Sequence, residues 1–266
     1  MNFEVLPERR AFRRVVFVVD QKTIDSLETD PTARDLLLRE DAAVLLATTD
    51  PDHADPVTRL LEAQGLLSPG SVLVLSPYRD GGYAPIEDAM DRFSLQKWTA
   101  LSTLCAYLGA RSLTVQVIED TESESRATFG VDVGRGPVKV SGKGGVKHLE
   151  NLAAQMDLND EYLGAAWDLE RANEYLATSG LGAEPEVASL VDARSFPGNM
   201  LSKRTLRVDL SRESERTIDA ALAIKVPTVL DIGAKFQHVS KNKAHYRVTV
   251  EVNFSHEGNL ASGGAE

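Results

Sequence analysis

Short apolar runs alternate with helical patterns through the first 120 residues. The apolar runs are rich in β-branched residues, as in strands buried on both faces, and lie at 15–19, 43–47, 71–75 and 113–118. Helical spacing falls between them, at 23–39 with an interruption near Asp30, at 56–67, and at 86–108 before Gly109. Strands that alternate with helices in this way predict an α/β part with a mostly parallel sheet. We therefore expect a Rossmann-like, three-layer domain over residues 1–120.

The pattern changes from residue 121 onward. Two short alternating segments around 134–137 predict a hairpin, and helices are expected at 148–158 and 160–176. Apolar and polar residues then alternate strictly, which predicts strands at 206–210, 218–226, 230–236 and 246–254, with a hairpin turn at 240–243. We expect an α+β domain over 121–256, in which the helices cover an antiparallel sheet, and a flexible tail at 257–266. The fold class is therefore α+β overall.

Composition narrows the class of protein. The chain of 266 residues has 40 acidic and 29 basic side chains and a formal net charge of -11. This acidic balance counts against a general nucleic-acid binder, which needs basic surface to displace counterions. The single cysteine, Cys105, excludes an internal disulfide and falls among the apolar residues of a predicted helix, so we expect it in the core. A cytoplasmic location is the expectation that follows.

Polar residues gather where the predicted parallel strands end, and ligands bind at that edge of open parallel sheets. The candidates for catalysis are Asp20, Asp50 and Asp80, those for metal binding are Asp20, Asp50 and Asp52, and those for ligand contact include Ser76 and Tyr78. Clustered carboxylates suit Mg²⁺, or could supply a nucleophile and a general acid. The alternative interpretation is that these aspartates cap the helices that follow.

The segment 16–23 resembles the first motif of haloacid-dehalogenase-type phosphotransferases, in which an apolar strand precedes Asp-x-Asp-x-Thr. Asp20 matches the nucleophile of that motif, whereas Lys22 stands where the second aspartate belongs and Thr23 comes one position early. The strand-end acid is also similar to that of PIN-like and NYN-like nucleases. Both resemblances imply phosphoryl chemistry centred on Asp20.

A glycine-rich loop at 141–148 follows a short predicted strand and precedes a helix. It resembles the Walker A phosphate loop, but the glycine before the final lysine is absent, and His148 replaces the hydroxyl residue that binds Mg²⁺. Backbone N–H groups at the start of a helix can still bind an anion, so Lys143, Gly144 and Gly145 are candidate ligand contacts. A surface loop without a ligand is the alternative.

Two histidines flank the predicted hairpin turn at 240–243. His238 and His245 are therefore expected to face each other across the strands, as a weak metal-binding or pH-sensing pair. Solvated turn histidines are the alternative.

No complete catalytic motif is found, so the leading hypothesis is a cytosolic binding or effector protein. Its α/β part would receive a ligand or partner, and its β part would mediate self-association or contact with a protein partner through a sheet edge. Membrane insertion is a lesser possibility, because the predicted strands within 217–236 match the length of membrane-crossing β-strands. The alternative function is a Mg²⁺-dependent hydrolase or phosphotransferase that uses Asp20, Asp50 and Asp80.

Overall fold

The structure is a computed structural model, and the chain forms two compact units that are each assembled from separate stretches. The first unit contains 1–77, 81–92 and 213–243, and the second contains 78–80, 93–212 and 244–266. The residues described are 13–30, 33–47, 56–78, 82–120, 127–132, 136–141, 146–156, 158–163, 167–196, 201–241 and 244–254. The helices α4 (Ala89–Tyr107) and α8 (Arg212–Leu222) begin in one unit and continue in the other.

The first unit contains a mixed sheet in the order β2-β1-β3-β4. Its strands are β1 (Val15–Val19), β2 (Ala42–Leu46), β3 (Val72–Leu75) and β4 (Tyr83–Pro85). β1 is parallel to β2 but antiparallel to β3, and β3 is antiparallel to β4. The prediction of a mostly parallel sheet is therefore not confirmed. An apolar run shows that a strand is buried, but its direction is decided by the connection that leads into it.

The first unit also contains helices, two of which, α8 and α9 (Gly233–Lys241), overlap segments where the sequence pattern predicted strands. The helices of this unit are α1 (Gln21–Thr29), α2 (Arg34–Leu37), α3 (Pro56–Ala63), α9 and most of α8, with a short 3-10 helix at Thr228–Leu230. The core on one face of the sheet joins Val16, Val18 and Leu73 to Leu61 of α3 and Tyr83 of β4. The predicted interruption near Asp30 is confirmed, because α1 ends at Thr29 and α2 begins at Arg34.

The second unit contains an antiparallel sheet in the order β7-β6-β5-β10-β9, and a short strand, β8, also pairs with β5. The strands are β5 (Ala110–Asp120), β6 (Ala127–Asp132), β7 (Gly136–Ser141), β8 (Asn159–Glu161), β9 (Lys203–Asp209) and β10 (Tyr246–Phe254). β6 and β7 pair antiparallel with Asp132 opposite Gly136, as the hairpin predicted around 134–137 requires, and residues 133–135 lie outside the described residues. Residue 120, where the predicted domain boundary lies, is the last residue of β5.

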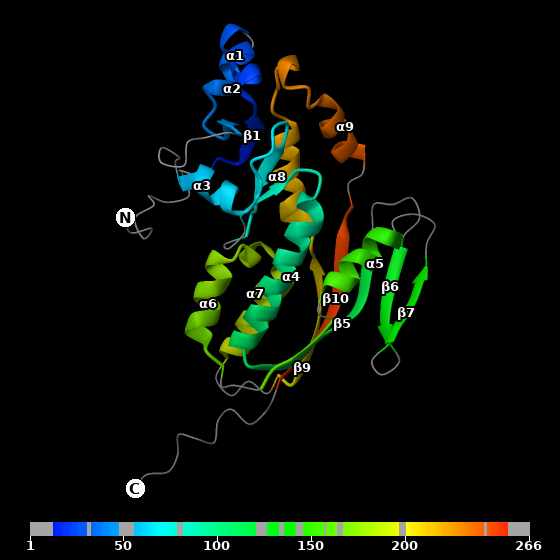
Figure 1. The fold of residues 1–266 in the computed structure, drawn as a ribbon. Helices are drawn as coiled ribbons and strands as arrows, with labels where there is room; N and C mark the ends of the chain where they lie inside the picture. Colours follow the sequence, from blue (N-terminus) through cyan, green and yellow to red (C-terminus); the bar gives the residue numbers. More distant parts are fainter. Residues whose placement is uncertain are drawn as a thin grey trace. The chain divides into compact units, whose positions relative to one another are not determined.

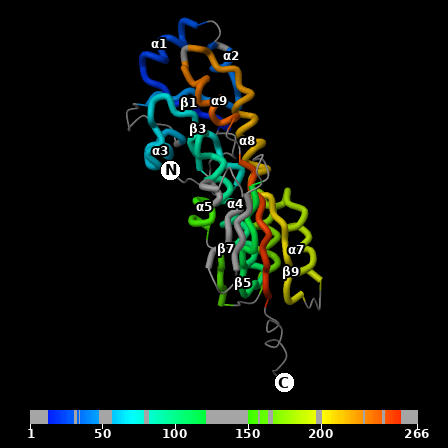
Figure 2. The backbone as a smooth tube through the Cα atoms, turned by 90° about the vertical axis from the view of Figure 1, so that its right-hand side faces the viewer, coloured from blue at the N-terminus to red at the C-terminus, as the bar shows by residue number. Residues whose placement is uncertain are grey.

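One face of this sheet is apolar and buried. Fully buried side chains come from the three adjacent strands β5, β10 and β9: Leu113, Val115, Ile118, Val248, Val250, Val252, Leu206 and Val208. Figure 1 shows α4 and α7 (Pro185–Ser195) on one side of these strands. α7 packs against β9, and the two run side by side in Figure 2. Cys105 of α4 is fully buried, as predicted, and burial raises the pKa of its thiol to about 12.

The strands predicted at 218–226 and 230–236 are helical in the structure. α8 covers the first of these segments up to Leu222 and α9 covers most of the second, while the predicted turn at 240–243 begins inside α9. Ser214, Ile218 and Ala221 of α8 are buried at spacings of four and three residues, which is helical periodicity. Alanines satisfy either period, because they can be counted as apolar or as surface residues. The segment 217–236, on which the hypothesis of membrane-crossing strands depended, thus contains α8, a 3-10 helix and α9 with short connecting segments between them, and no strand.

Two further boundaries in the second unit differ from the prediction. The helix expected at 160–176 begins only at Leu169, as α6 (Leu169–Thr178), because Asn159–Glu161 pairs with β5 as β8. α7 was not predicted, although Pro185 occupies its first turn, where proline favours a helix start. The helix expected at 148–158 is α5 (Val146–Gln155), which packs against β6 and β5. Among the described helices, none has the length and apolar character that a membrane span requires.

Candidate functional site

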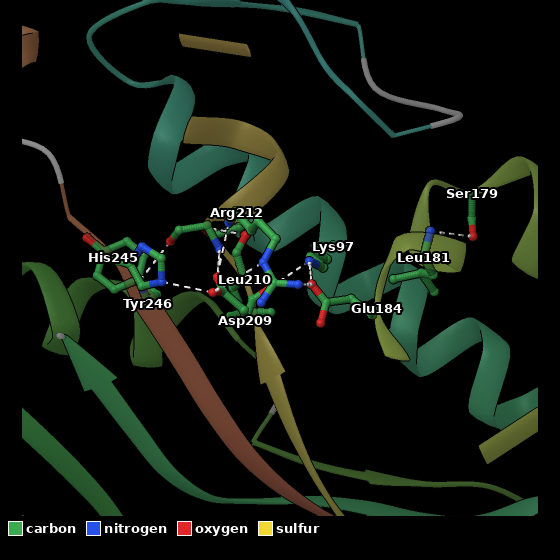
Figure 3. Close-up of polar contacts among 11 residues, drawn as sticks. Lys97, Ser179, Leu181, Glu184, Asp209, Leu210, Arg212, His245 and Tyr246 are labelled. Atoms are coloured by element: carbon green, nitrogen blue, oxygen red, sulfur yellow. Dashed lines mark hydrogen bonds and ion pairs between the residues drawn. The ribbon is translucent and has the colours of Figure 1, made fainter. Parts of the chain in front are cut away.

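A fully buried ion pair lies between α4 and the start of α7 in the second unit. None of the Lys97 side chain and only 3% of the Glu184 side chain is exposed, and Lys97 Nζ lies 2.7 Å from Glu184 Oε1. Lys97 Nζ also donates a hydrogen bond to the backbone carbonyl of Asp209, at the end of β9. Figure 3 shows Lys97 between these two partners. A charge buried this deeply is tolerated only when it is paired and hydrogen-bonded, and Lys97 meets both conditions.

The carboxylate of Asp209 joins the end of β9 to α8 and to the start of β10. Asp209 Oδ1 accepts hydrogen bonds from the backbone N–H groups of Ser211 and Arg212, each at 3.0 Å, and Oδ2 lies 2.8 Å from Nε2 of His245. Burial raises the pKa of Asp209, but the hydrogen bond and charge of His245 and the two backbone N–H groups outweigh it and lower that pKa to about 2. The carboxylate is therefore ionised at neutral pH.

These contacts define a polar cluster made of Lys97, Glu184, Asp209, Arg212 and His245. We call it the buried polar cluster because Lys97, Glu184 and Asp209 are buried, whereas the side chains of Arg212 and His245 are 41% and 18% exposed. Arg212 completes it at longer range, with Nη1 4.0 Å from Glu184 Oε1 and Nε 3.9 Å from Asp209 Oδ2. Next to the cluster, Ser211 Oγ accepts a hydrogen bond of 2.7 Å from the backbone N–H of Tyr246. Chemically, the ionised Asp209 carboxylate can accept a hydrogen bond from the ring N–H of His245. The contacts as a whole fix the ends of β9 and β10.

β9 lies at one end of the sheet order, so one of its sides faces no other described strand. Two backbone hydrogen bonds, from Leu210 N to the Tyr246 carbonyl and from Phe254 N to the Ser202 carbonyl, show which residues of β9 hydrogen-bond to β10. In an antiparallel ladder, alternate residues bond to the partner. The backbone groups of the even-numbered residues of β9 therefore hydrogen-bond to β10, and the odd-numbered residues direct their N–H and C=O groups to the opposite side.

We call this opposite side, from Lys203 to Arg207, the β9 edge. Within the described residues, no hydrogen bond to the backbone groups of Thr205 or Arg207 reaches across it. The next outward carbonyl, that of Asp209, is taken by Lys97. The buried polar cluster therefore ends the β9 edge, and no described residue bonds to the outward backbone donor and acceptor of Thr205 or of Arg207.

The side chains along the β9 edge are basic and exposed. Lys203 Nζ lies 2.7 Å from Glu251 Oε1 of β10, and Arg207 Nη2 lies 2.9 Å from Glu119 Oε2 of β5, while the exposed fractions of the two basic side chains are 56% and 58%. Arg204 points to the other face, where it donates hydrogen bonds to the carbonyl and hydroxyl oxygens of Ser189. The strand thus carries basic side chains on both faces.

The site residues predicted from the sequence have other surroundings. Asp20 is the N-cap of α1, where its carboxylate accepts a 2.8 Å hydrogen bond from Thr23 N, and this bond lowers the pKa of Asp20. Ser76 and Tyr78 are buried just after β3 and stay predicted ligand contacts. Asp50, Asp52, Asp80, Lys143, Gly144 and Gly145 lie outside the described residues. The part of the chain that is described brings no three potential metal ligands together.

Sequence reasoning missed the buried polar cluster, although one signal was present. Lys97 occupies the apolar face of α4, between Phe93 and Leu101, where a charged residue predicts a buried partner. The hairpin expected to bring His238 and His245 together is not formed, because His238 belongs to α9. His245 contacts Asp209. Asp209 lies far from both Lys97 and His245 in sequence, so no local pattern connects them.

Comparisons of the chain with known protein families, with curated proteins and with solved structures found no match.

Proposed function

We propose that this chain is a binding protein whose second unit takes up an extended segment of another chain as an added strand beside β9. The observation that carries the proposal is the β9 edge, where Thr205 and Arg207 direct backbone donors and acceptors away from β10. Strand addition is a common mode of peptide recognition, in which main-chain hydrogen bonds supply affinity and alternate side chains supply specificity.

Two structural features support the β9 edge as a recognition surface. The strand is held rigidly at its end, because the buried polar cluster binds both the carboxylate and the carbonyl of Asp209. Its apolar side chains, Leu206 and Val208, are fully buried beneath it. An incoming strand therefore meets a surface that is already ordered, which lowers the entropic cost of binding.

A proline at Thr205 tests the proposal. Thr205→Pro removes an N–H group that faces the β9 edge and leaves the pairing of β9 with β10 intact, since Thr205 does not bond to β10. Peptides enriched on the wild-type protein from a random display library are expected to bind this variant at least tenfold more weakly. Thr205→Ala, which keeps the N–H group, is the matched control and should bind them like wild type. Circular dichroism confirms that both variants fold.

Two outcomes would contradict strand addition at β9. One is a library without enriched peptides, and the other is a set of enriched peptides that bind Thr205→Pro as well as wild type. Sedimentation velocity over a range of protein concentrations identifies self-association as a further outcome. Self-association that is lost in Thr205→Pro but kept in Thr205→Ala would make a second copy the occupant.

The hydrolase hypothesis stays a prediction. Asp20, the described member of its proposed trio, accepts a hydrogen bond as the N-cap of α1. Of the described residues, none gives this hypothesis an observation of its own, so strand addition is the function that we propose.

A further inference from the structure

We infer that the strand taken up by the β9 edge carries acidic side chains at alternate positions; this inference rests on the proposed function. Lys203, Thr205 and Arg207 lie on one face of β9, because side chains alternate along a strand. In an added strand, the residues directly opposite them lie on the same face, with Cβ atoms about 4.5–5.5 Å away. Carboxylates at those positions would meet Lys203 and Arg207.

The ion pairs that exist already leave room for these carboxylates. Arg207 meets Glu119 through Nη2, and a guanidinium carries five N–H donors in a planar fork. More than half of the Lys203 and Arg207 side chains is exposed, on the face where the added strand would place its acidic residues. Arg204 adds positive charge to β9, because its bonds run to neutral oxygens of Ser189.

A second copy of β9 fits the same edge poorly. In an antiparallel self-pairing centred on Thr205, which uses Lys203, Thr205 and Arg207 of both copies, each Lys203 would lie opposite the Arg207 of the other copy. Like charges directly opposite each other destabilise a strand pair. Lysine on an edge strand is also a common device against edge-to-edge association. The basic edge thus selects against its own copy and for an acidic partner.

The intervening positions of the partner strand that lie opposite Leu206 and Val208 should be apolar. These two side chains are fully buried in the core of the second unit, on the same face as Arg204. The expected ligand is therefore an extended peptide in which acidic and apolar residues alternate.

Three synthetic peptides test this inference, in which valine alternates with glutamate, with serine or with lysine. Binding of the dye-labelled peptides to the full chain is measured by fluorescence anisotropy at low and high salt. We expect the glutamate peptide to bind at least tenfold more tightly than the lysine peptide at low salt, and we expect added salt to reduce this difference. The double variant Lys203→Gln with Arg207→Gln should reduce the difference to less than threefold. Lys225→Gln, which removes an exposed lysine of the first unit, should not change it.

The outcomes separate this inference from the proposed function. One outcome is that the glutamate and serine peptides bind wild type equally and both fail to bind Thr205→Pro. That result would overturn the acidic preference but leave strand addition standing. A glutamate preference that survives the double variant would overturn it as well. Binding of the glutamate peptide that persists in Thr205→Pro would place it elsewhere on the molecule, and would contradict both proposals.

Discussion

Lys97 shows how a single side chain can hold several elements of the second unit together. It lies in α4 and binds Glu184, at the start of α7, and the carbonyl of Asp209, at the end of β9. Removing one partner of a buried ion pair typically costs about 3–5 kcal/mol, because the other charge is left buried without compensation. Lys97 therefore positions the end of β9 relative to α4 and α7, and loss of its charge would leave Glu184 buried without a partner of comparable strength.

Asp209 is a second such residue, and its ionisation predicts that the free energy of unfolding depends on pH. The pKa of Asp209 in the folded protein, about 2, lies below the ordinary value of 3.8. A carboxylate whose pKa is lowered by folding stabilises the fold when the pH is above the pKa that the group has in the unfolded chain. This stabilisation is lost as the pH falls from about 4 toward 2. We expect Asp209→Asn to lower the free energy of unfolding by about 2 kcal/mol at pH 7, with a difference that shrinks below pH 4.

Urea unfolding of wild type and Asp209→Asn between pH 3 and pH 7 measures this difference. Asp20→Asn is the comparison, because asparagine caps a helix as well as aspartate does. Asp20 is exposed, so its difference from wild type should be smaller than that of Asp209→Asn at pH 7. A difference between Asp209→Asn and wild type that does not change with pH would contradict the assigned role of the carboxylate.

Among the elements, α4 was predicted from the sequence as a helix and the last part of α8 was predicted as a strand, and their sequences show why. α4 has a long apolar stripe and ends at Tyr107, two residues before Gly109, which has a φ of 73°, as the sequence predicts for a left-handed cap. α8 is short, and Ala220 and Ala221 at its end fit either period, so its apolar residues alternate as well as they repeat at helical spacing. Its start is marked by the Asp209 carboxylate, which accepts hydrogen bonds from Ser211 and Arg212. Cap signals of this kind were available in the sequence but were outweighed by the alternation.

The end of α4 gives a test at the scale of the element. Gly109→Ala places a side chain in the left-handed region and should lower the free energy of unfolding by about 1 kcal/mol, whereas Gly109→Asn should cost less. Gly233→Ala is the control, because the position has no positive φ and an added Cβ meets no atom within 4 Å. Denaturant unfolding compares the three variants, and equal effects of alanine at 109 and 233 would contradict the assignment of the cap.

At the scale of the whole molecule, the two units are interleaved along the chain. The segment 213–243 belongs to the first unit, although it lies between β9 and β10 of the second. β9 and β10 are nevertheless adjacent strands, and the bond between Asp209 and His245 joins the residues on either side of this excursion. Neither unit is therefore a continuous piece of sequence.

This interleaving predicts that a fragment of residues 1–120 will not form its last strand, β5. The fragment lacks β6 and β10, the neighbours of β5, so Leu113, Val115 and Ile118 would lose their cover. We expect amide NMR spectra of the fragment to show no dispersed signals for 110–120, and mixing with a fragment of 121–266 to restore them. A fragment that unfolds cooperatively and shows dispersed signals for β5 on its own would establish the predicted boundary at residue 120 instead.

The sequence by itself determined where most strands lie, because a run such as Val15–Val19 is too apolar to be anything but buried, and the alternation of 246–254 requires one wet face and one dry face. It also predicted the burial of Cys105 and the end of α4 before Gly109. The direction of β3, the helices within 217–236 and the buried polar cluster were decided by the tertiary structure. These features depend on contacts between residues far apart in sequence, such as Lys97 with Glu184 and Asp209 with His245. The β9 edge belongs with them, because an edge exists only once the other strands have taken their places.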